Sequence, residues 1–414
     1  MRHRIWPKGP NTSIPSRNLE KELLARLAAA VIAEDRQLVI SLVIALSNLQ
    51  DTPYCREALE TLAKCLETDD WEAMSKVFTD PGMFFGSDGK FLMVGNYSIR
   101  RNGSVSTELT LMAGRARMDL VEINGRALYD YFDSVDIHSK STGDLFAHPV
   151  PVIFPIELDS FAGPVGNESG EAFVVPDGWE QIPNAEAGHV FNIMAEQRRR
   201  FRESGETALR RILTTETADL VLGLLGTGEV EDRHRALEYQ THDIGHSTGL
   251  GLHQKLHDNL LGSPRHRGVE EFRADGIGLS LVKPLMSKGQ FAGICASNFA
   301  TRFGVDAHRR GGISLDTDMI AVALLFKTAF ESGLFHIQNR KIGFANPTPE
   351  SLIALYQASS EKALAITRQE LNLARPEGIQ FLYEQLASTV LPSEQDLFQI
   401  LVTEPCQGIF GDLQ

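Results

Sequence analysis

The chain has 414 residues, of which 43% are hydrophobic and 23% are charged, and these proportions are typical of folded globular proteins rather than disordered ones. Its net charge of −14 at pH 7 argues against nucleic acid as a partner, because phosphate neutralisation needs clustered Lys and Arg. The length exceeds the size at which one core keeps growing, so we expect two domains or one large two-lobed domain.

The cysteines and the N-terminal region indicate the cellular compartment to expect. The four cysteines are widely scattered with no CxxC spacing, which indicates neither a disulfide framework nor a cysteine zinc cluster. The basic N-terminal residues are not followed by an apolar stretch of signal-peptide form, and the apolar run from Leu38 to Leu46 is too short to span a bilayer. We therefore expect a cytoplasmic protein with no membrane partner.

The first third of the chain changes from helical to strand-like patterning. Residues 18–78 repeat apolar positions at helical spacing, whereas turn signals recur about every ten residues between positions 83 and 133. Strands of an antiparallel sheet are predicted over 90–101, 105–114 and 116–123, with Asn102-Gly103 as a hairpin turn. The Pro- and Gly-rich segment 139–184 is predicted to be a connection, within which VPVIFPIEL could form a short buried strand.

From Ala185 onward the helical period returns and continues almost to the end of the chain. The last long helix should begin with Thr348 as its N-cap and Pro349 just inside its start. The predicted fold class is α+β, with a mainly helical C-terminal part and a smaller N-terminal part that contains an antiparallel sheet. The predicted organisation is 1–138, a connection over 139–184, and 185–414.

Two short helical motifs carry the chemistry. The segment HDIGH places His242 and His246 four residues apart, so both imidazoles lie on one helix face. Glu271, in the later segment EEFRADGIGL, can complete a two-histidine, one-carboxylate zinc site with a position left for water. Asp275, one turn further, and Glu270 can accept the spare N–H of a liganding histidine. Each motif alone is more simply a polar helix face, and their joint occurrence predicts the metal site.

This arrangement resembles the gluzincin metallopeptidases, in which HExxH lies on one helix and ExxxD on a following helix. The segment EEFRADGIGL is similar, more particularly, to the dipeptidyl peptidase III family, whose corresponding stretch supplies the third zinc ligand through its second glutamate, here Glu271. The resemblance covers residues 235–340. It implies a zinc-dependent hydrolase in which a zinc-bound water attacks an amide or a short peptide.

The sequence departs from that family at the histidine motif. The family's histidines are one residue further apart, and Asp243 stands at the position of the catalytic glutamate. Asp243 can do the same acid/base work with a shorter arm. The same His-Asp pair also resembles the HD-domain phosphohydrolases, in which His242 and Asp243 would both bind metal, with an upstream histidine such as His189 or His234 and a downstream aspartate as the other ligands. A metalloenzyme with a non-hydrolytic small-molecule reaction is a further alternative, and so is a non-catalytic, purely structural site.

Other residues complete the predicted site. His308 is a candidate catalytic group, and Arg309 and Arg310 are candidates for substrate binding, because this cationic cluster could stabilise a developing oxyanion or hold a carboxylate. Gly245, inside the first helix, suggests the close approach of another backbone or of a substrate. Zn²⁺ is the expected cofactor; Fe²⁺ is second, since non-haem iron enzymes use the same ligands. The expected partner is a small-molecule or short-peptide substrate, and the sequence leaves the oligomeric state open.

Overall fold

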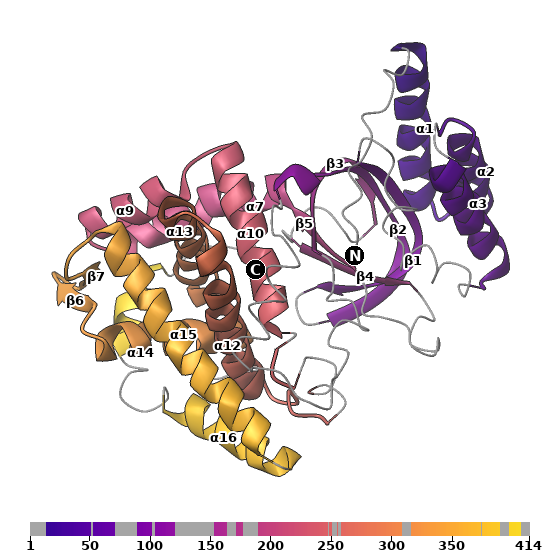
Figure 1. Cartoon of the computed structure of the whole chain (residues 1–414). Helices are drawn as coiled ribbons and strands as arrows, with labels where there is room; N and C mark the ends of the chain where they lie inside the picture. Colours follow the sequence, from indigo (N-terminus) through magenta and orange to yellow (C-terminus); the bar gives the residue numbers. More distant parts are fainter. Residues whose placement is uncertain are drawn as a thin grey trace. The chain divides into compact units, whose positions relative to one another are not determined.

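A computed structural model describes residues 14–50, 53–70, 89–101, 104–120, 153–163, 171–176, 189–246, 248–250, 255, 258–308, 316–373, 375–389 and 397–406. The chain divides into two compact units, each described below by itself (Figure 1). The first unit comprises Met1–Asp119 and Pro151–Gln197, and the second comprises Leu120–Val150 and Arg198–Gln414.

In its described residues, the first unit contains three helices and a small closed barrel (Figure 1). Its elements are α1 (Ile14–Ile32), α2 (Arg36–Ser47), α3 (Pro53–Thr68), β1 (Lys90–Arg101), β2 (Ser104–Ala116), the 3-10 turn η1 (Met118–Leu120), β3 (Ile153–Ala162), β4 (Glu171–Pro176) and β5 (His189–Ile193). The strand order is β1-β2-β3-β5-β4, with β3 and β5 parallel and every other described pair antiparallel. Arg101 of β1 lies opposite Ser104 of β2, which confirms the predicted hairpin, although Asn102 and Gly103 lie outside the described residues.

Two expectations about this sheet were wrong. The third strand predicted over 116–123 is instead a 3-10 turn in its described part, from Met118 to Leu120, and residues 121–123 lie outside the described residues. The segment expected to be a connection contributes β3 and β4 to the barrel, and the short strand allowed for VPVIFPIEL is present as the first part of β3. Pro155 is tolerated near the start of β3, where it needs no amide hydrogen and its carbonyl accepts from the Arg117 amide at 2.7 Å.

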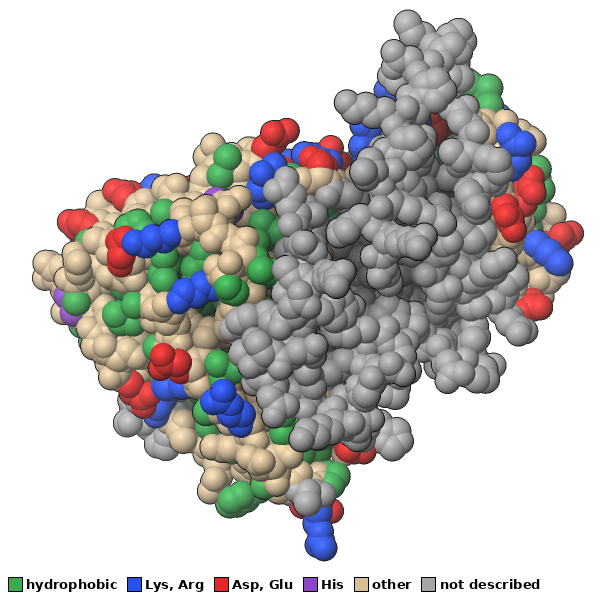
Figure 2. Space-filling view, viewed as in Figure 1, with side chains coloured by type: hydrophobic (Ala, Val, Ile, Leu, Met, Phe, Trp, Pro, Cys, Tyr) green, Lys and Arg blue, Asp and Glu red, His purple; other side chains and the backbone are tan. Residues whose placement is uncertain are grey.

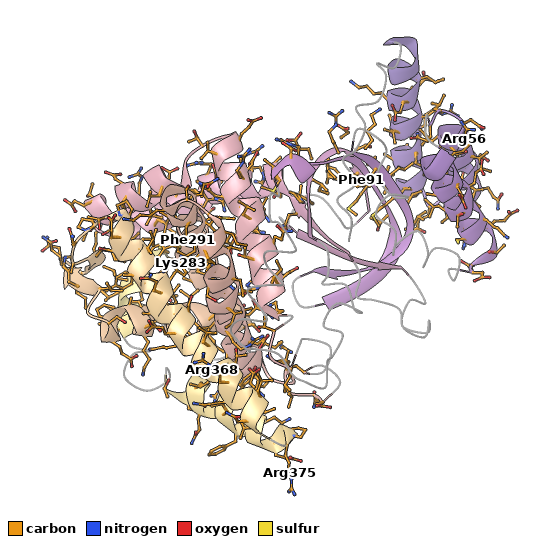
Figure 3. The ribbon with its side chains drawn as sticks, viewed as in Figure 1. Arg56, Phe91, Lys283, Phe291, Arg368 and Arg375 are labelled. Carbon is orange, nitrogen blue, oxygen red and sulfur yellow. The ribbon has the colours of Figure 1, made fainter. Side chains whose placement is uncertain are left out.

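A glycine lets the barrel curve at the contact between β2 and β3. The pairing register shifts between Ala113 and Gly114, which marks a β-bulge. A Cβ at Gly114 would lie 2.0 Å from the Glu157 carbonyl oxygen, so a larger residue would push the two strands apart. The barrel and the helices share one core, in which Leu27, Val43 and Phe91 are buried together (Figure 3).

The second unit is mainly helical. Its elements are α7 (Met194–Arg200, which begins in the first unit), the π-helix η3 (Phe201–Gly205), α8 (Glu206–Ile212), α9 (Thr215–Leu225), α10 (Glu229–His246), α12 (Pro264–Val282), the 3-10 turn η4 (Lys283–Leu285), α13 (Lys288–Gly304), the 3-10 turn η5 (Asp306–His308), α14 (Thr317–Glu331), β6 (Phe335–Gln338), β7 (Lys341–Phe344), α15 (Pro349–Asn372), α16 (Pro376–Ser388), the π-helix η6 (Gln399–Thr403) and the 3-10 turn η7 (Glu404–Cys406). The predicted α+β class, mainly helical with a small sheet in the N-terminal half, is confirmed.

Helix α12 lies at the centre of this unit. It packs against α10, α14, α15 and α16, and most of its residues are buried, including the apolar Val269 and Ile277 (Figure 1). Phe291 of α13 belongs to the same core (Figure 3). The predicted start of the last long helix is confirmed, because the Thr348 side chain accepts a hydrogen bond from the Ser351 amide and Pro349 opens α15.

The surface of the second unit mixes charges of both signs. On the face shown in Figure 2, Lys and Arg side chains are interspersed with Asp and Glu, and apolar side chains lie scattered between them. Within the described part of the chain, no helix combines the length and the apolar character needed to cross a membrane.

Candidate metal centre

The candidate centre lies where α10 and α12 touch through glycines. A Cβ at Gly245 of α10 would lie 2.1 Å from the Ala274 carbonyl oxygen, and a Cβ at Gly278 of α12 would lie 2.0 Å from the Thr241 carbonyl oxygen. The two helix backbones are thus as close as they can be, and the close approach predicted from Gly245 is confirmed, with the backbone of Ala274 as its partner. Side chains on the facing sides of the two helices are consequently within reach of one another.

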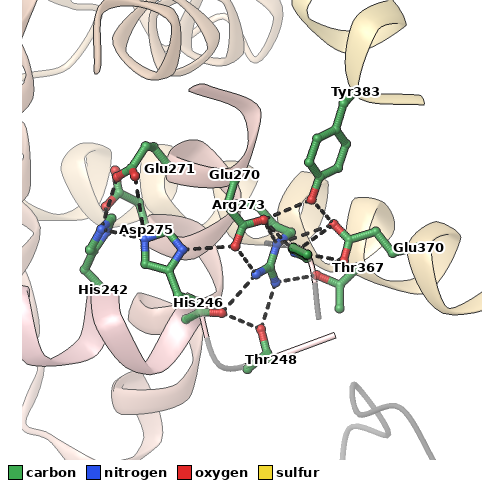
Figure 4. A network of polar contacts seen from close by, with 12 residues as sticks. His242, His246, Thr248, Glu270, Glu271, Arg273, Asp275, Thr367, Glu370 and Tyr383 are labelled. Carbon is green, nitrogen blue, oxygen red and sulfur yellow. Dashed lines mark hydrogen bonds and ion pairs between the residues drawn. The ribbon is translucent and has the colours of Figure 1, made fainter. Parts of the chain in front are cut away.

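Three ligand groups converge at this contact. The His242 and His246 Nε2 atoms lie 3.1 Å apart, and the Glu271 carboxylate lies 3.1 Å from the first and 3.7 Å from the second (Figure 4). Among the described residues these three form a group whose ligand atoms all fall within 4.8 Å of one another. Two nitrogens that bind one tetrahedral zinc at about 2.0–2.1 Å are about 3.3 Å apart, so the donor set fits such an ion.

A carboxylate holds the far nitrogen of each histidine. The Nδ1 of His242 lies 2.7 Å from Asp275 Oδ1, and the Nδ1 of His246 lies 3.0 Å from Glu270 Oε1. Since a carboxylate accepts, each Nδ1 donates to its carboxylate, and Nε2 is the nitrogen that each ring can offer to a metal. This is the arrangement in which histidines bind metal in proteins.

The charges around the three groups favour a positive charge between them. Burial alone would lower the pKa of His242, but the neighbouring Glu271 and Asp275 carboxylates raise it well above its ordinary value. Burial would raise the pKa of Glu271, yet the histidines and Arg302 lower it far below its ordinary value. Carboxylates that stay ionised in a buried site are the partners that a cation needs.

Arg302 of α13 belongs to the site and was missed by the sequence analysis. Its Nε donates to Asp275 Oδ2 at 2.7 Å, its Nη2 lies 3.4 Å from Glu271 Oε2, and its Nη1 donates to Asp306 and Asp318 at 3.1 and 3.0 Å. The guanidinium keeps Asp275 ionised: burial raises the pKa of that carboxyl, but Arg302 and His242 lower it below its usual value. An isolated arginine in a helix gives no signal of such a role.

Behind His246 the corresponding support is fully buried. Arg273 donates to both oxygens of Glu270, at 2.6 and 2.8 Å, and also to the Gly245 carbonyl at 3.1 Å (Figure 4). Burial would raise the pKa of Glu270, but Arg273 and Lys255 lower it well below its ordinary value. Glu270 was predicted from the sequence, whereas Arg273 and Lys255 were not.

The remaining predicted residues have different surroundings. Asp243 is half-buried on α10 beside His242 and is not part of the three-residue group. His308 is buried and its Nε2 donates to the Phe303 carbonyl at 3.0 Å, while burial lowers its pKa to about 4. The ring is therefore neutral at pH 7, and its Nε2 proton is already used. Arg309 and Arg310 lie outside the described residues.

The geometry also bears on the HD-domain alternative. That alternative needs Asp243 as a ligand together with an upstream histidine. His234 forms a hydrogen bond with the Leu225 carbonyl at 3.0 Å, and burial lowers its pKa; the side chain of His189 lies outside the described residues. The described ligand group contains Glu271 in place of Asp243.

Comparison with known sequences gives no match that includes the residues of the candidate centre. A profile of a family of unknown function (DUF6014) matches residues 46–197. This match ends at Gln197, where the first compact unit also ends, and it includes none of the residues of the candidate centre. No curated protein matches the chain.

Comparison with solved structures gives two similar folds. DPP III from Caldithrix abyssi is 14% identical with a TM-score of 0.64, and the match covers 91% of this chain and 69% of that one. The dipeptidyl-peptidase III from Corallococcus sp. strain EGB is 14% identical with a TM-score of 0.53, and the match covers 89% and 66%. The likeness extends well beyond residues 235–340, and this chain spans about two thirds of either neighbour's length. The chain has a dipeptidyl peptidase III-like fold.

Proposed function

We propose that this chain is a zinc-dependent hydrolase that cleaves an amide bond in a short peptide. The observation that carries the proposal is the convergence of His242, His246 and Glu271 within 4.8 Å, with both histidine Nδ1 atoms held by carboxylates. The dipeptidyl peptidase III-like fold supports the choice of substrate, as an analogy at the level of the fold.

In this proposal the side chains of α10 and α12 have separate tasks. His242, His246 and Glu271 hold the ion, which when bound supplies Lewis acidity for the activation of water. Asp275 and Glu270 fix the orientation and tautomer of the two rings. Asp243 takes a proton from the attacking water and delivers it to the leaving nitrogen as the C–N bond breaks. Its arm is one methylene shorter than that of glutamate, so the substrate carbonyl must approach α10 more closely.

Metal analysis of the purified protein tests the ligand set. We expect about one zinc per chain in the wild type, retained in Glu350→Ala, whose glutamate is exposed and paired with Lys288. Glu271→Ala should lose more affinity than the roughly 10–100-fold typical of groups that only support a ligand. Metal content unchanged in Glu271→Ala would contradict the proposed site, and iron in place of zinc would change the reaction class.

A second variant tests the reaction. Asp243→Asn should keep its metal and lose hydrolysis of short peptides, because the amide cannot accept the proton. Loss of metal from Asp243→Asn would favour the HD-type phosphohydrolase instead, since there the aspartate is a ligand. Full peptidase activity in Asp243→Asn would contradict the role given to this residue.

A further inference from the structure

A cluster of charged and hydroxyl groups lies fully buried behind His246. We call it the buried cluster; its members are Lys255, Glu270, Arg273, Glu370 and Tyr383, each no more than 1% exposed. They come from the region after α10, from α12, from α15 and from α16. A buried ion pair costs much of what it gains, so five such groups in one place need a reason other than stability.

The contacts of the cluster meet at Glu270. Lys255 Nζ lies 2.6 Å from Glu270 Oε2 and 3.1 Å from Glu370 Oε2. The Tyr383 hydroxyl lies 2.9 Å from Glu270 Oε2 and also contacts Glu370, so it can donate its single proton to either carboxylate (Figure 4). Glu270 Oε1, by contrast, faces His246 Nδ1. The two oxygens of one carboxylate thus join the cluster to a histidine of the candidate centre.

The charges of the cluster balance. Lys255 and Arg273 supply two positive charges, and Glu270 and Glu370 supply two negative ones. Glu270 Oε1 accepts from Arg273 Nη2 at 2.6 Å and lies 3.0 Å from His246 Nδ1, so the ring shares this oxygen with a buried guanidinium. Glu270 thus connects His246 to groups from α15 and α16, more than a hundred residues further along the chain.

We propose that Tyr383 is a positioning residue for the metal centre: through Glu270 it fixes the His246 ring, so that metal affinity depends on α15 and α16. This inference rests on the proposed metal site. The Tyr383 hydroxyl is one of three donors to Glu270 Oε2, together with Lys255 and Arg273. Without the hydroxyl, Glu270 is held by one group fewer, and the His246 Nε2 is then less well aimed at the ion.

A second buried tyrosine provides a matched control. Tyr356 of α15 is 1% exposed, and its hydroxyl donates to Asn298 Oδ1 at 2.8 Å, whose amide donates to Glu238 Oε1 at 2.9 Å. Each tyrosine therefore uses its buried hydroxyl in a series of polar contacts that leads towards α10. The difference is that Glu270 accepts from a predicted ligand, whereas no side-chain hydrogen bond among the described residues joins Glu238 to His242 or His246.

The experiment compares Tyr383→Phe with Tyr356→Phe. Zinc affinity is measured by competition with a chelator, and the ligand field is followed by the visible spectrum of the Co²⁺-loaded protein. We expect Tyr383→Phe to bind zinc about tenfold more weakly, at the lower end of the effect of supporting groups, with an altered Co²⁺ spectrum. Tyr356→Phe should stay within about twofold of wild type with an unchanged spectrum, although both variants lose a buried hydrogen bond.

Equal zinc affinities for wild type and Tyr383→Phe would overturn the inference. Equal losses of zinc affinity in Tyr383→Phe and Tyr356→Phe would also overturn it, because they would indicate a general loss of stability. If Tyr383→Phe does not fold, Glu370→Gln is the deciding variant. Glu370 contacts both Tyr383 and Lys255, so this change should also lower zinc affinity. A Glu370→Gln protein with wild-type zinc affinity would overturn the inference. A wild-type protein that binds neither metal would instead refute the proposed function itself.

Discussion

Each histidine of the candidate centre is supported by a chain of contacting side chains, which we call its arm. The two arms have the same composition but differ in burial. In each arm a histidine donates to a carboxylate, the carboxylate accepts from an arginine, and the arginine contacts a further carboxylate. In the His242 arm the side chains of Asp275 and Asp318 are 7% and 21% exposed, whereas in the His246 arm Glu270 and Glu370 are 1% and 0% exposed. We therefore expect changes in the His246 arm, which we call the sealed arm, to reduce stability more than changes in the His242 arm, which we call the open arm. Changes in either arm should weaken metal binding.

The largest effect should follow from breaking the sealed arm. Arg273→Met removes a fully buried cation and leaves Glu270 and Glu370 with Lys255 alone, an uncompensated buried charge that should lower the free energy of unfolding by about 3–5 kcal/mol. Urea denaturation of the metal-free protein measures this. Arg302→Met is the control and should cost about 1–3 kcal/mol, because two of its partners reach solvent. Equal losses would show that the difference in burial has no energetic weight.

Glu238 of α10 makes the stability of the fold sensitive to pH. Burial, with a smaller contribution from Asp275, raises the pKa of Glu238 to about 7 from an ordinary 4.5. A carboxyl with a raised folded pKa binds its proton more tightly when folded, so its contribution to stability is lost as pH rises from about 4.5 to 7 and stays lost above that. The loss amounts to about 3 kcal/mol.

Glu238→Gln tests this contribution, because glutamine has the same shape and does not titrate. The free energy of unfolding of the metal-free variant, compared with wild type across pH 4.5–8, should lack the fall of about 3 kcal/mol. Other titrating groups act equally on both proteins and cancel in the comparison. Parallel pH profiles of the two proteins would show that Glu238 does not titrate in this range.

Measurement of zinc affinity compares the two arms most directly. Asp275→Asn and Glu270→Gln each replace the carboxylate that holds one histidine, and each should weaken zinc binding by about 10–100-fold. The two variants should differ in stability: Glu270→Gln unbalances the buried cluster, whereas Asp275→Asn leaves Arg302 with Asp306 and Asp318. If either variant keeps wild-type zinc affinity, the corresponding arm does not support the metal site.

The local part of this site could be predicted from the sequence. The pairs His242/His246 and Glu271/Asp275 are four residues apart, and helical periodicity alone places each pair on one face. Gly245 likewise indicated a close backbone approach that the structure places at Ala274. Such signals are contained within a single turn of helix, so they survive without knowledge of the tertiary fold.

The groups that support the site could not be predicted in this way. Arg302 reaches Asp275 across 27 residues and Lys255 reaches Glu370 across 115, and neither separation carries a periodic signal. The barrel was incompletely predicted for the same reason: β3 lies in a proline-rich segment and is stabilised by pairing with β2 and with the distant, parallel β5. Tertiary partners decided the structure where local propensity was weak.

The smallest expected effect concerns the helix contact on which both arms depend. Gly245→Ala adds a Cβ that would meet the Ala274 carbonyl oxygen at 2.1 Å, so α10 must move away from α12. Overpacking costs about 1–3 kcal/mol, of which the better helix propensity of alanine returns about 1 kcal/mol, leaving a net loss of about 1 kcal/mol in the free energy of unfolding.

Gly223→Ala in α9 is the matched control, because its Cβ meets nothing within 4 Å and should stabilise the protein by about 0.5–1 kcal/mol. Thermal or urea denaturation gives the sign of each change. Gly245→Ala should also weaken zinc binding, since the histidines of α10 and Glu271 of α12 move apart together, while Gly223→Ala leaves zinc binding unchanged. A stabilised Gly245→Ala with wild-type zinc affinity would mean that the two helices can separate without disturbing either arm, and the arms would then owe their geometry to their own hydrogen bonds rather than to the glycine contact.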